Sequence, residues 1–279
     1  MSEINLQEFS FENPPPVKNY PLYFWHIFVK VLSFTLFGIG TIFISIIAFP
    51  VMKILFWKEE KFRKAGHHFI SFTFRFFVWF MSVLQAFRLT VDDKKKFRSL
   101  KSSVIVANHP SLLDVVMLIS LIPDADCIVN ASLAGKNIVH VIVSKLYIPN
   151  SLPHDELMKK CLESLKSGSC LIIFPEGTRS LPKGQNKYKK GAARVSLTSE
   201  CPITPVYIGG NDKRGLRKHD SMFKFNTRER YIYNLRLHEP IFPQEYKDIP
   251  YPAASKKITE RLSKILSDAN NADLFKQYR

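Results

Sequence analysis

The feature that most constrains this chain is a run of 22 residues without a charge, from Val31 to Met52, close to the N-terminus. As a helix this run would be about 33 Å long, which is enough to cross the hydrocarbon core of a bilayer. Trp25 and Trp57 flank it at positions typical of membrane surfaces. A core helix of a soluble protein would be shorter and would have one polar face, so we predict a membrane helix. No cleavable signal peptide is expected, because no basic region precedes the run and no small-residue cleavage site follows it.

A second apolar segment, residues 67–88, carries a narrow polar stripe with Arg75 in its middle. Because an arginine is costly in lipid, we predict an interfacial or re-entrant helix paired with the first, with a second full span as the alternative. Basic clusters follow both segments. Two full spans would separate these clusters, whereas one span or a hairpin within one leaflet keeps both on the cytoplasmic side. The apolar face of this segment consists of Phe69, Phe72, Phe76, Phe80, Val83 and Phe87.

Composition supports this division of the chain. The 279 residues contain 46% hydrophobic and 23% charged residues, with 40 Lys and Arg against 24 Asp and Glu, for a net charge of +16. Most of the phenylalanines and all three tryptophans lie between residues 24 and 87, whereas 32 of the 40 basic residues follow residue 87. Such an excess suits an acidic partner: nucleic acid, an anionic membrane or a phosphorylated substrate. No zinc spacing or aromatic-rich RNA-binding strand is present, so nucleic acid is not expected as the partner.

The rest of the chain alternates short apolar runs with helical patterns. This alternation predicts an α/β fold in which a mainly parallel sheet is flanked by helices and preceded by the membrane-embedded helix pair. We divide the chain into a polar arm at 1–21, a membrane-associating helix pair at 22–90 and a globular domain at 91–279. Strands are expected at 103–107, 170–174, 203–208 and 231–238, and helices at 155–166 and 252–268.

The four cysteines form no CxxC pair and lie near no histidine pair at metal-ligand spacing. We expect them to be reduced thiols in a cytosolic domain, with no bound metal. They are Cys127, Cys161, Cys170 and Cys201.

The first group of residues with chemical potential follows the predicted strand 103–107. His109 leaves that strand and Asp114 comes five residues later, in the first turn of the next helix. Asp114 could hold one imidazole nitrogen while the other takes a proton from a hydroxyl. The alternative is a capping box, in which Ser111 and Asp114 serve only the helix N-terminus.

The second group, Phe174 to Ser180, also follows an apolar strand. Gly177 permits a tight turn near a ligand, and Arg179 can hold a phosphate or carboxylate through several donors. Glu176 could accept a hydrogen bond from a substrate hydroxyl. The alternative is a solvated loop with a surface pair between Glu176 and Arg179. Residues 183–191 add several lysines and no acid beside this turn.

Four motifs occur in order between residues 102 and 210: NHxxxxD at 108–114, FPEGTRS at 174–180, KKGA at 189–192 and CPITPV at 201–206. In order and spacing they resemble the lysophospholipid acyltransferase family, whose best-known members are 1-acylglycerol-3-phosphate acyltransferases. The resemblance implies a membrane-bound O-acyltransferase of phospholipid biosynthesis, with residues 91–279 as its catalytic domain on the cytoplasmic side. The membrane would be of the bacterial inner-membrane type if the source is bacterial.

The resemblance also implies roles for individual residues. His109 would be the general base that deprotonates the acceptor hydroxyl, and Asp114 would orient the imidazole. The acyl chain would come from acyl-CoA or acyl-carrier-protein as co-substrate, with no further cofactor, metal or covalent intermediate. Membrane lipids would supply the acceptor. The matching acceptor-binding positions are Glu176, Gly177, Thr178 and Arg179, and Pro205 matches a position associated with the acyl donor.

One stretch departs from the family pattern. The second motif usually ends in an arginine that helps to bind the acceptor phosphate, whereas residues 146–151 here read LYIPNS. Lys136 or Lys145 could substitute, although lysine is a point charge rather than a two-pronged donor. The acceptor therefore stays open between 1-acylglycerol-3-phosphate and another lyso-lipid, such as a lyso-ornithine lipid. A lipid or thioester hydrolase using the same His–Asp pair is the remaining alternative.

Overall fold

The computed structural model describes residues 17, 19–130, 139–180, 187–220 and 230–277. Most of the predicted polar arm lies outside the described residues. The helices are α1 (Tyr20–Phe43), η2 (Ile44–Ala48), α2 (Phe49–Leu55), α3 (Glu59–Val83), α4 (Lys94–Ser99), α5 (Asp114–Leu121), α6 (Val139–Leu146), α7 (His154–Lys166), α8 (Gly191–Ser199), η4 (Pro243–Tyr246) and α9 (Tyr251–Gln277). The strands are β1 (Phe87–Val91), β2 (Val104–Ala107), β3 (Ala125–Val129), β4 (Ile148–Pro149), β5 (Cys170–Ile173), β6 (Ile203–Gly209) and β7 (Tyr231–Leu237).

The strands form one mixed, mainly parallel sheet in the order β1-β7-β6-β2-β5-β3-β4. All neighbouring pairs are parallel except β6 and β7, which run antiparallel. The predicted mainly parallel sheet flanked by helices is therefore confirmed, with one antiparallel pair that the alternation of strands and helices did not indicate. The short central strands are buried on both faces, as expected where helices cover both sides of a sheet.

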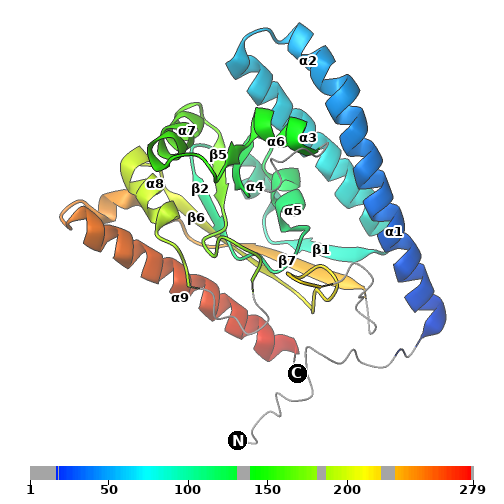
Figure 1. Ribbon diagram of the computed structural model, residues 1–279. Coiled ribbons are helices and arrows are strands. Elements are labelled where there is room, and N and C mark those ends of the chain that lie inside the picture. Colours follow the sequence, from blue (N-terminus) through cyan, green and yellow to red (C-terminus); the bar gives the residue numbers. More distant parts are fainter. Residues whose placement is uncertain (1–16, 18, 131–138, 181–186, 221–229, 278–279) are drawn as a thin grey trace, which may run out of the picture.

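Alternate residues of the central strands enter two separate cores. In β2, Ile105 and Ala107 join the core under α3 and α5, whereas Val104 and Val106 join the core under α7, α8 and α9. This period of two places the sheet between two helical layers. Figure 1 shows the arrangement, with α1, α2 and α3 on one side of the sheet and α7, α8 and α9 on the other.

A single helical rod covers Tyr20 to Leu55, because α1 continues through the π-helical turn η2 into α2. In the described part of the chain it is the one helix long and apolar enough to cross a membrane, and only 17% of its most apolar window is buried. Large apolar side chains cover its outside, among them Ile54 and Leu55 at 76% and 70% exposure. A core helix of a soluble protein would hide most of this surface.

The second helix differs from its prediction at both ends, since it begins at Glu59 rather than at residue 67. α3 ends at Val83, and Phe87 and Arg88 belong to β1, whereas the apolar pattern predicted a helix to residue 88. Gln85 adopts a left-handed φ of 61° and turns the chain out of the helix. Phe87 then pairs in register with Tyr231 of β7. Local periodicity did not reveal this edge strand, because its partner lies over 140 residues away.

The two faces of α3 have unequal surroundings. Part of its predicted polar stripe packs on the globular domain, while Phe72, Phe76, Trp79 and Val83 are all more than half exposed. Of the buried polar side chains on the inner face, His67 has hydrogen-bond partners in the globular domain, whereas the Ser71 hydroxyl has none among the described residues. The buried residues of α3 are Phe62, Gly66, His67, Ile70, Ser71, Val78 and Met81.

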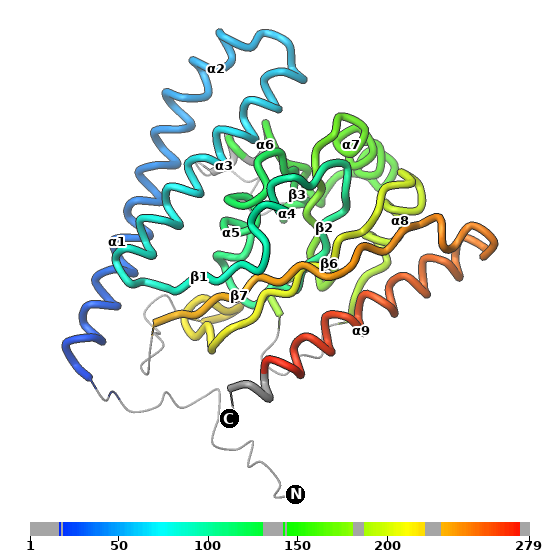
Figure 2. The backbone as a smooth tube through the Cα atoms, turned by 180° about the vertical axis from the view of Figure 1, so that it is seen from behind, coloured from blue at the N-terminus to red at the C-terminus, as the bar shows by residue number. Residues whose placement is uncertain are grey.

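Polar contacts hold α3 against the domain. Arg63 pairs with the buried carboxylate of Asp126 at 2.6 Å. Nδ1 of His67 lies 3.0 Å from Oδ1 of Asp124, and its Nε2 lies 3.1 Å from the carbonyl oxygen of Leu146. α1 follows α3 on its other side, as Figure 2 shows from behind. There Phe37 contacts Phe74 and Phe77, and the Trp25 indole donates to the carbonyl of Leu84.

The remaining predicted elements lie close to their expected positions. β2, β5, β6 and β7 each start or end within one residue of prediction, and α9 continues nine residues beyond the predicted Asp268. The boundaries of the three predicted units stay predictions.

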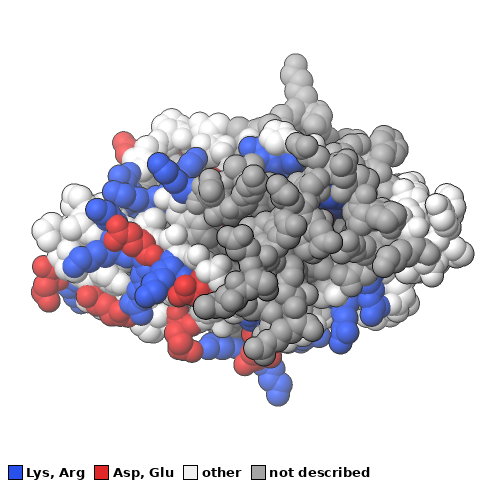
Figure 3. Space-filling model, turned by 90° about the horizontal axis from the view of Figure 1, so that it is seen from below, with Lys and Arg blue, Asp and Glu red and all other residues white. Residues whose placement is uncertain are grey.

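Basic side chains on α9 lie next to acidic ones. Arg261 pairs with Glu245 at 2.6 Å, and Lys256 lies 3.8 Å from Glu260. On the underside, Lys and Arg alternate with Asp and Glu at the left end, whereas the described residues at the right end show Lys and Arg without acids (Figure 3). The positive charge of this face is therefore accompanied by acids only at one end.

Candidate active site

The site begins where β2 ends, at Asn108. Its side chain donates from Nδ2 to the carbonyl of Ile208 and accepts from the Ile208 amide at Oδ1, at 2.9 and 2.7 Å. This two-way contact takes the place of a backbone ladder at the end of β2 and joins it to β6. His109 is consequently presented from a fixed point at the carboxyl edge of the sheet, where open α/β folds bind ligands.

His109 and Asp114 are in direct contact. Nδ1 of His109 lies 2.8 Å from Oδ2 of Asp114, with the imidazole 16% exposed and the carboxylate fully buried. Asp114 also accepts from the amide of Ser111 at 2.7 Å and from its hydroxyl at 2.6 Å. The predicted capping box is not formed, because α5 begins at Asp114 after Leu113 as its N-cap, and the Asp114 carboxylate binds the imidazole and Ser111 instead.

The second motif lies directly beside this pair. The ring of Phe174 stacks on the His109 imidazole, with 4.1 Å between centroids and 22° between planes. Glu176, only 8% exposed, accepts from the His109 amide at 3.2 Å and from the Ser180 hydroxyl at 2.6 Å. The Ser180 amide in turn donates to the His109 carbonyl at 2.6 Å. The turn is therefore part of the wall that supports the histidine, and Glu176 is buried there rather than on the surface.

Arg179 is oriented by a segment that the sequence did not single out, residues 211–220. Its Nη1 donates to the carbonyls of Leu216 and Arg217 at 3.0 and 2.8 Å. The Leu216 carbonyl also accepts from the amide of Leu112, next to the dyad. Lys30 of α1 donates to the carbonyl of Gly215 at 3.1 Å. The segment consequently connects the apolar helix, Arg179 and the start of α5.

A signal for this segment exists in the sequence, where three cations occur within five residues after the strand β6: Lys213, Arg214 and Arg217. All three are less than 9% exposed, which is unusual for such residues. Hydropathy alone marks them as a solvated loop, and only the tertiary structure brings them to the site.

The other predicted site residues occupy different places. Thr178 is half-buried beside Gly177. Pro205 is buried within β6, opposite Val106, and its carbonyl accepts from the amide of His238 at 2.9 Å. Lys145 is exposed at the end of α6. Lys136 and residues 183–186 lie outside the described residues.

Gly177 occupies a position that requires glycine, with φ of +69° and Nζ of Lys189 only 2.8 Å from where a Cβ would stand. Gly177→Ala should therefore lower the free energy of unfolding by about 1 kcal/mol. Gly168 has φ of +95° with open space around it, and it lies at the end of α7 away from the motif. Gly168→Ala should cost similar stability, measured by thermal unfolding, while only Gly177→Ala lowers catalytic turnover. Equal turnover in both variants would show that the turn shape does not matter for the site.

The three buried thiols, Cys127, Cys161 and Cys170, are not suited to act as nucleophiles. All four cysteines are free, and three are buried. Burial raises the pKa of Cys161 and of Cys170 to about 12, so both stay protonated near neutral pH. Within the described ranges, no group of three His, Cys, Asp or Glu side chains is arranged to hold a metal ion.

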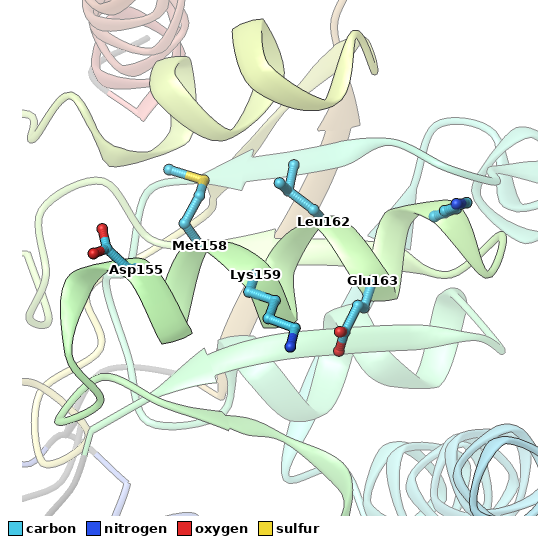
Figure 4. Close-up of a pocket in the computed structure, with 6 residues that line it drawn as sticks. Asp155, Met158, Lys159, Leu162 and Glu163 are labelled. Carbon is cyan, nitrogen blue, oxygen red and sulfur yellow. The ribbon is translucent and has the colours of Figure 1, made fainter.

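A shallow surface hollow of about 350 Å³ lies along the outer face of α7. Figure 4 shows its side chains, among them Asp155, Met158 and Glu163, projecting from that one helix. Its lining includes neither the His109–Asp114 pair nor the turn at 174–180. We therefore assign it no part in the site.

Comparison with known proteins gives independent evidence on the class of this protein. The sequence profile of the Acyltransferase family matches residues 88–209. A chloroplastic 1-acyl-sn-glycerol-3-phosphate acyltransferase of Brassica napus is 26% identical over 222 residues, which are 73% of this chain and 58% of that protein. A probable 1-acyl-sn-glycerol-3-phosphate acyltransferase of Mycoplasma pneumoniae is 24% identical over 178 residues, 58% of this chain and 65% of that protein. The chain spans about half the length of the curated relatives it matches.

The fold also matches a solved structure. The 1-acyl-sn-glycerophosphate (LPA) acyltransferase PlsC of Thermotoga maritima superposes with a TM-score of 0.66 at 18% identity, covering 88% of this chain and 94% of that one. A mainly parallel sheet with a histidine–aspartate pair at its carboxyl edge and an acyltransferase sequence profile defines a domain of the acyltransferase class. In sequence the chain is similar to 1-acyl-sn-glycerol-3-phosphate acyltransferases, and residues 88–209 match the Acyltransferase family.

Proposed function

We propose that this protein transfers an acyl chain from acyl-CoA or acyl-carrier-protein to a hydroxyl of a lyso-lipid at a membrane. The observation that carries the proposal is the contact between His109 and Asp114, in which a buried carboxylate holds one ring nitrogen of a partly exposed imidazole. The named relatives, all 1-acyl-sn-glycerol-3-phosphate acyltransferases, support the same chemistry.

The contact suggests how the residues would act. Because Asp114 is an acceptor, His109 carries its proton on Nδ1 and leaves a lone pair on Nε2. Nε2 takes the proton of the acceptor hydroxyl as its oxygen attacks the thioester carbonyl. The carbon–sulfur bond then breaks, and the departing thiolate receives the proton from Nε2. Asp114 stabilises the transient imidazolium. Because the acceptor oxygen attacks the thioester directly, the acyl chain is never bound covalently to the enzyme in this proposal.

The acceptor is proposed to bind beside the turn at 174–180. Arg179 is the phosphate ligand in this proposal, and the backbone around Gly177 lets a headgroup approach closely. We propose 1-acyl-sn-glycerol-3-phosphate as the first acceptor, on the strength of the relatives' names. Residues 146–151 contain no arginine, which favours testing other lyso-lipids, including lyso-ornithine lipid, beside it.

Membrane attachment follows from the same proposal. The rod from Tyr20 to Leu55 would lie in lipid, and the exposed face of α3 that carries Phe72, Phe76 and Trp79 would dip into the same leaflet. The globular domain would then lie on the cytoplasmic side, where its positive charge meets anionic headgroups or an acidic carrier protein.

Mass spectrometry of the purified full chain in detergent or vesicles tests this function. The enzyme is offered a panel of lyso-lipids with both acyl-CoA and acyl-carrier-protein donors, and we expect an acylated lipid with release of the free thiol. Release of free fatty acid without an acylated lipid would instead identify a hydrolase. If no pairing of donor and acceptor yields either product, the proposed function is wrong.

A further inference from the structure

A tyrosine far from the motifs contacts the dyad through a serine. Tyr233, in β7, is fully buried, and its hydroxyl donates to the hydroxyl of Ser111 at 2.9 Å. Ser111 is also fully buried and donates to Asp114 at 2.6 Å. Asp114 in turn receives the Nδ1 proton of His109 at 2.8 Å. A continuous chain of hydrogen bonds therefore runs from β7 to the imidazole.

The hydrogen-bonding capacity of the Ser111 hydroxyl sets the direction of these hydrogen bonds. A hydroxyl has one proton and two lone pairs. The Ser111 oxygen accepts from the Tyr233 hydroxyl at 2.9 Å and from the amide of Leu113 at 3.2 Å, which occupies both lone pairs. Its single proton is thereby directed to Oδ1 of Asp114. Without the tyrosine hydroxyl, one lone pair of Ser111 would lose its donor.

The tyrosine is itself held in place. Nζ of Lys213 lies 4.4 Å from the centroid of its ring, and the Phe87 ring packs on it edge-on at 5.9 Å and 79°. Lys213 is anchored by the carbonyls of Asn211 and Ile232. Burial raises the pKa of Tyr233 well above its ordinary value, so the phenol keeps the proton it donates.

We propose that Tyr233 is a positioning residue of the active site, which directs the Ser111 proton onto Asp114 and thereby holds the His109 imidazole in its working orientation. This inference rests on the proposed acyl transfer by His109. Neither the motifs nor their spacing includes residue 233, which lies 119 positions after Asp114 on a strand that runs antiparallel to its neighbour β6.

Tyr233→Phe tests the proposal, since it removes one oxygen and keeps the ring. We expect kcat for acyl transfer to fall about five- to tenfold, as for loss of one buried hydrogen bond, with KM within about twofold. The matched control is Tyr207→Phe on the neighbouring strand β6. Tyr207 is 3% exposed and donates to Asn270 of α9 at 3.2 Å. This control should keep kcat unchanged, whereas an equal fall in both variants would overturn the proposal.

A double substitution distinguishes positioning from simple loss of stability. If Tyr233 acts through Ser111, Tyr233→Phe should change kcat less than about twofold once Ser111→Ala is already present. Full additivity of the two losses would overturn the proposal. Thermal unfolding of all variants checks that each is folded at the assay temperature.

A measurement without substrate separates this inference from the proposed function. In the full chain labelled with ¹⁵N-histidine, the Nδ1 proton of His109 is assigned by its loss in His109→Ala. We expect that resonance to shift in Tyr233→Phe and to stay in place in Tyr207→Phe. A shift in a protein without transfer activity would retain the positioning role and reject the function. Transfer activity with an unmoved resonance would support the proposed function and reject the positioning role.

Discussion

His109→Ala is expected to lower acyl transfer by about 10²- to 10⁴-fold, the range typical for loss of a general base. The imidazole is 16% exposed and follows the end of β2. Its replacement by alanine removes one hydrogen-bond donor from the buried Asp114 carboxylate, which keeps both hydrogen bonds from Ser111. The folded protein should therefore remain. Initial rates of lyso-lipid acylation, measured with saturating donor and acceptor, check the expectation.

A second histidine provides the matched control. His154 is exposed at the start of α7, and His154→Ala should keep the wild-type rate. Circular dichroism and thermal unfolding of both variants verify that each is folded. If His109→Ala retains more than about a tenth of the wild-type turnover, a general base at this position is excluded.

Asp114→Asn has the second-largest expected effect, and it acts on both rate and stability. The amide can accept through one atom only, whereas the carboxylate receives protons from His109 and twice from Ser111. The amide nitrogen must then face either the Ser111 hydroxyl, which donates to Oδ1, or His109 and the Ser111 amide, which both donate to Oδ2. We expect turnover to fall by about 10²- to 10⁴-fold, because the imidazole loses the acceptor that sets its tautomer.

The stability cost of Asp114→Asn should be about 1–3 kcal/mol, the usual consequence of leaving a buried donor without an acceptor. Urea unfolding measures this cost, and the kinetic assay measures turnover on the same preparation. Asp155→Asn is the control, since Asp155 is an exposed acid in the first turn of α7. A loss of stability with turnover intact would mean that Asp114 serves only the N-terminus of α5.

Part of the fold was predictable because its signals are local. The apolar run from Val31 to Met52 has no charge, and a run of that length has few structural solutions. Strands such as 170–173 stood out because residues buried on both faces form short continuous apolar runs. The edge strand β1 was read as the end of a helix, since Phe87 continues the spacing of the phenylalanines in α3.

The candidate site divides in the same way. His109 and Asp114 lie five residues apart, at the end of one element and the start of the next, so the short connection between them could suggest their contact. The turn at 174–180 was recognisable from its residue types, but its contact with the His109 amide depends on β5 lying next to β2 in the sheet. That neighbourhood is a property of the strand order, which periodicity does not encode.

The sequence by itself determined the apolar helix, the α/β alternation and the residues at the ends of two strands, because each depends on contacts within a few turns of chain. Only the tertiary structure decided what surrounds them. It brought the carbonyls of 216 and 217 to Arg179, Lys30 to Gly215 and Tyr233 to Ser111. These partners lie 37 to 185 residues apart, and their meeting depends on the buried area of the whole sheet and its helices, which no local pattern specifies.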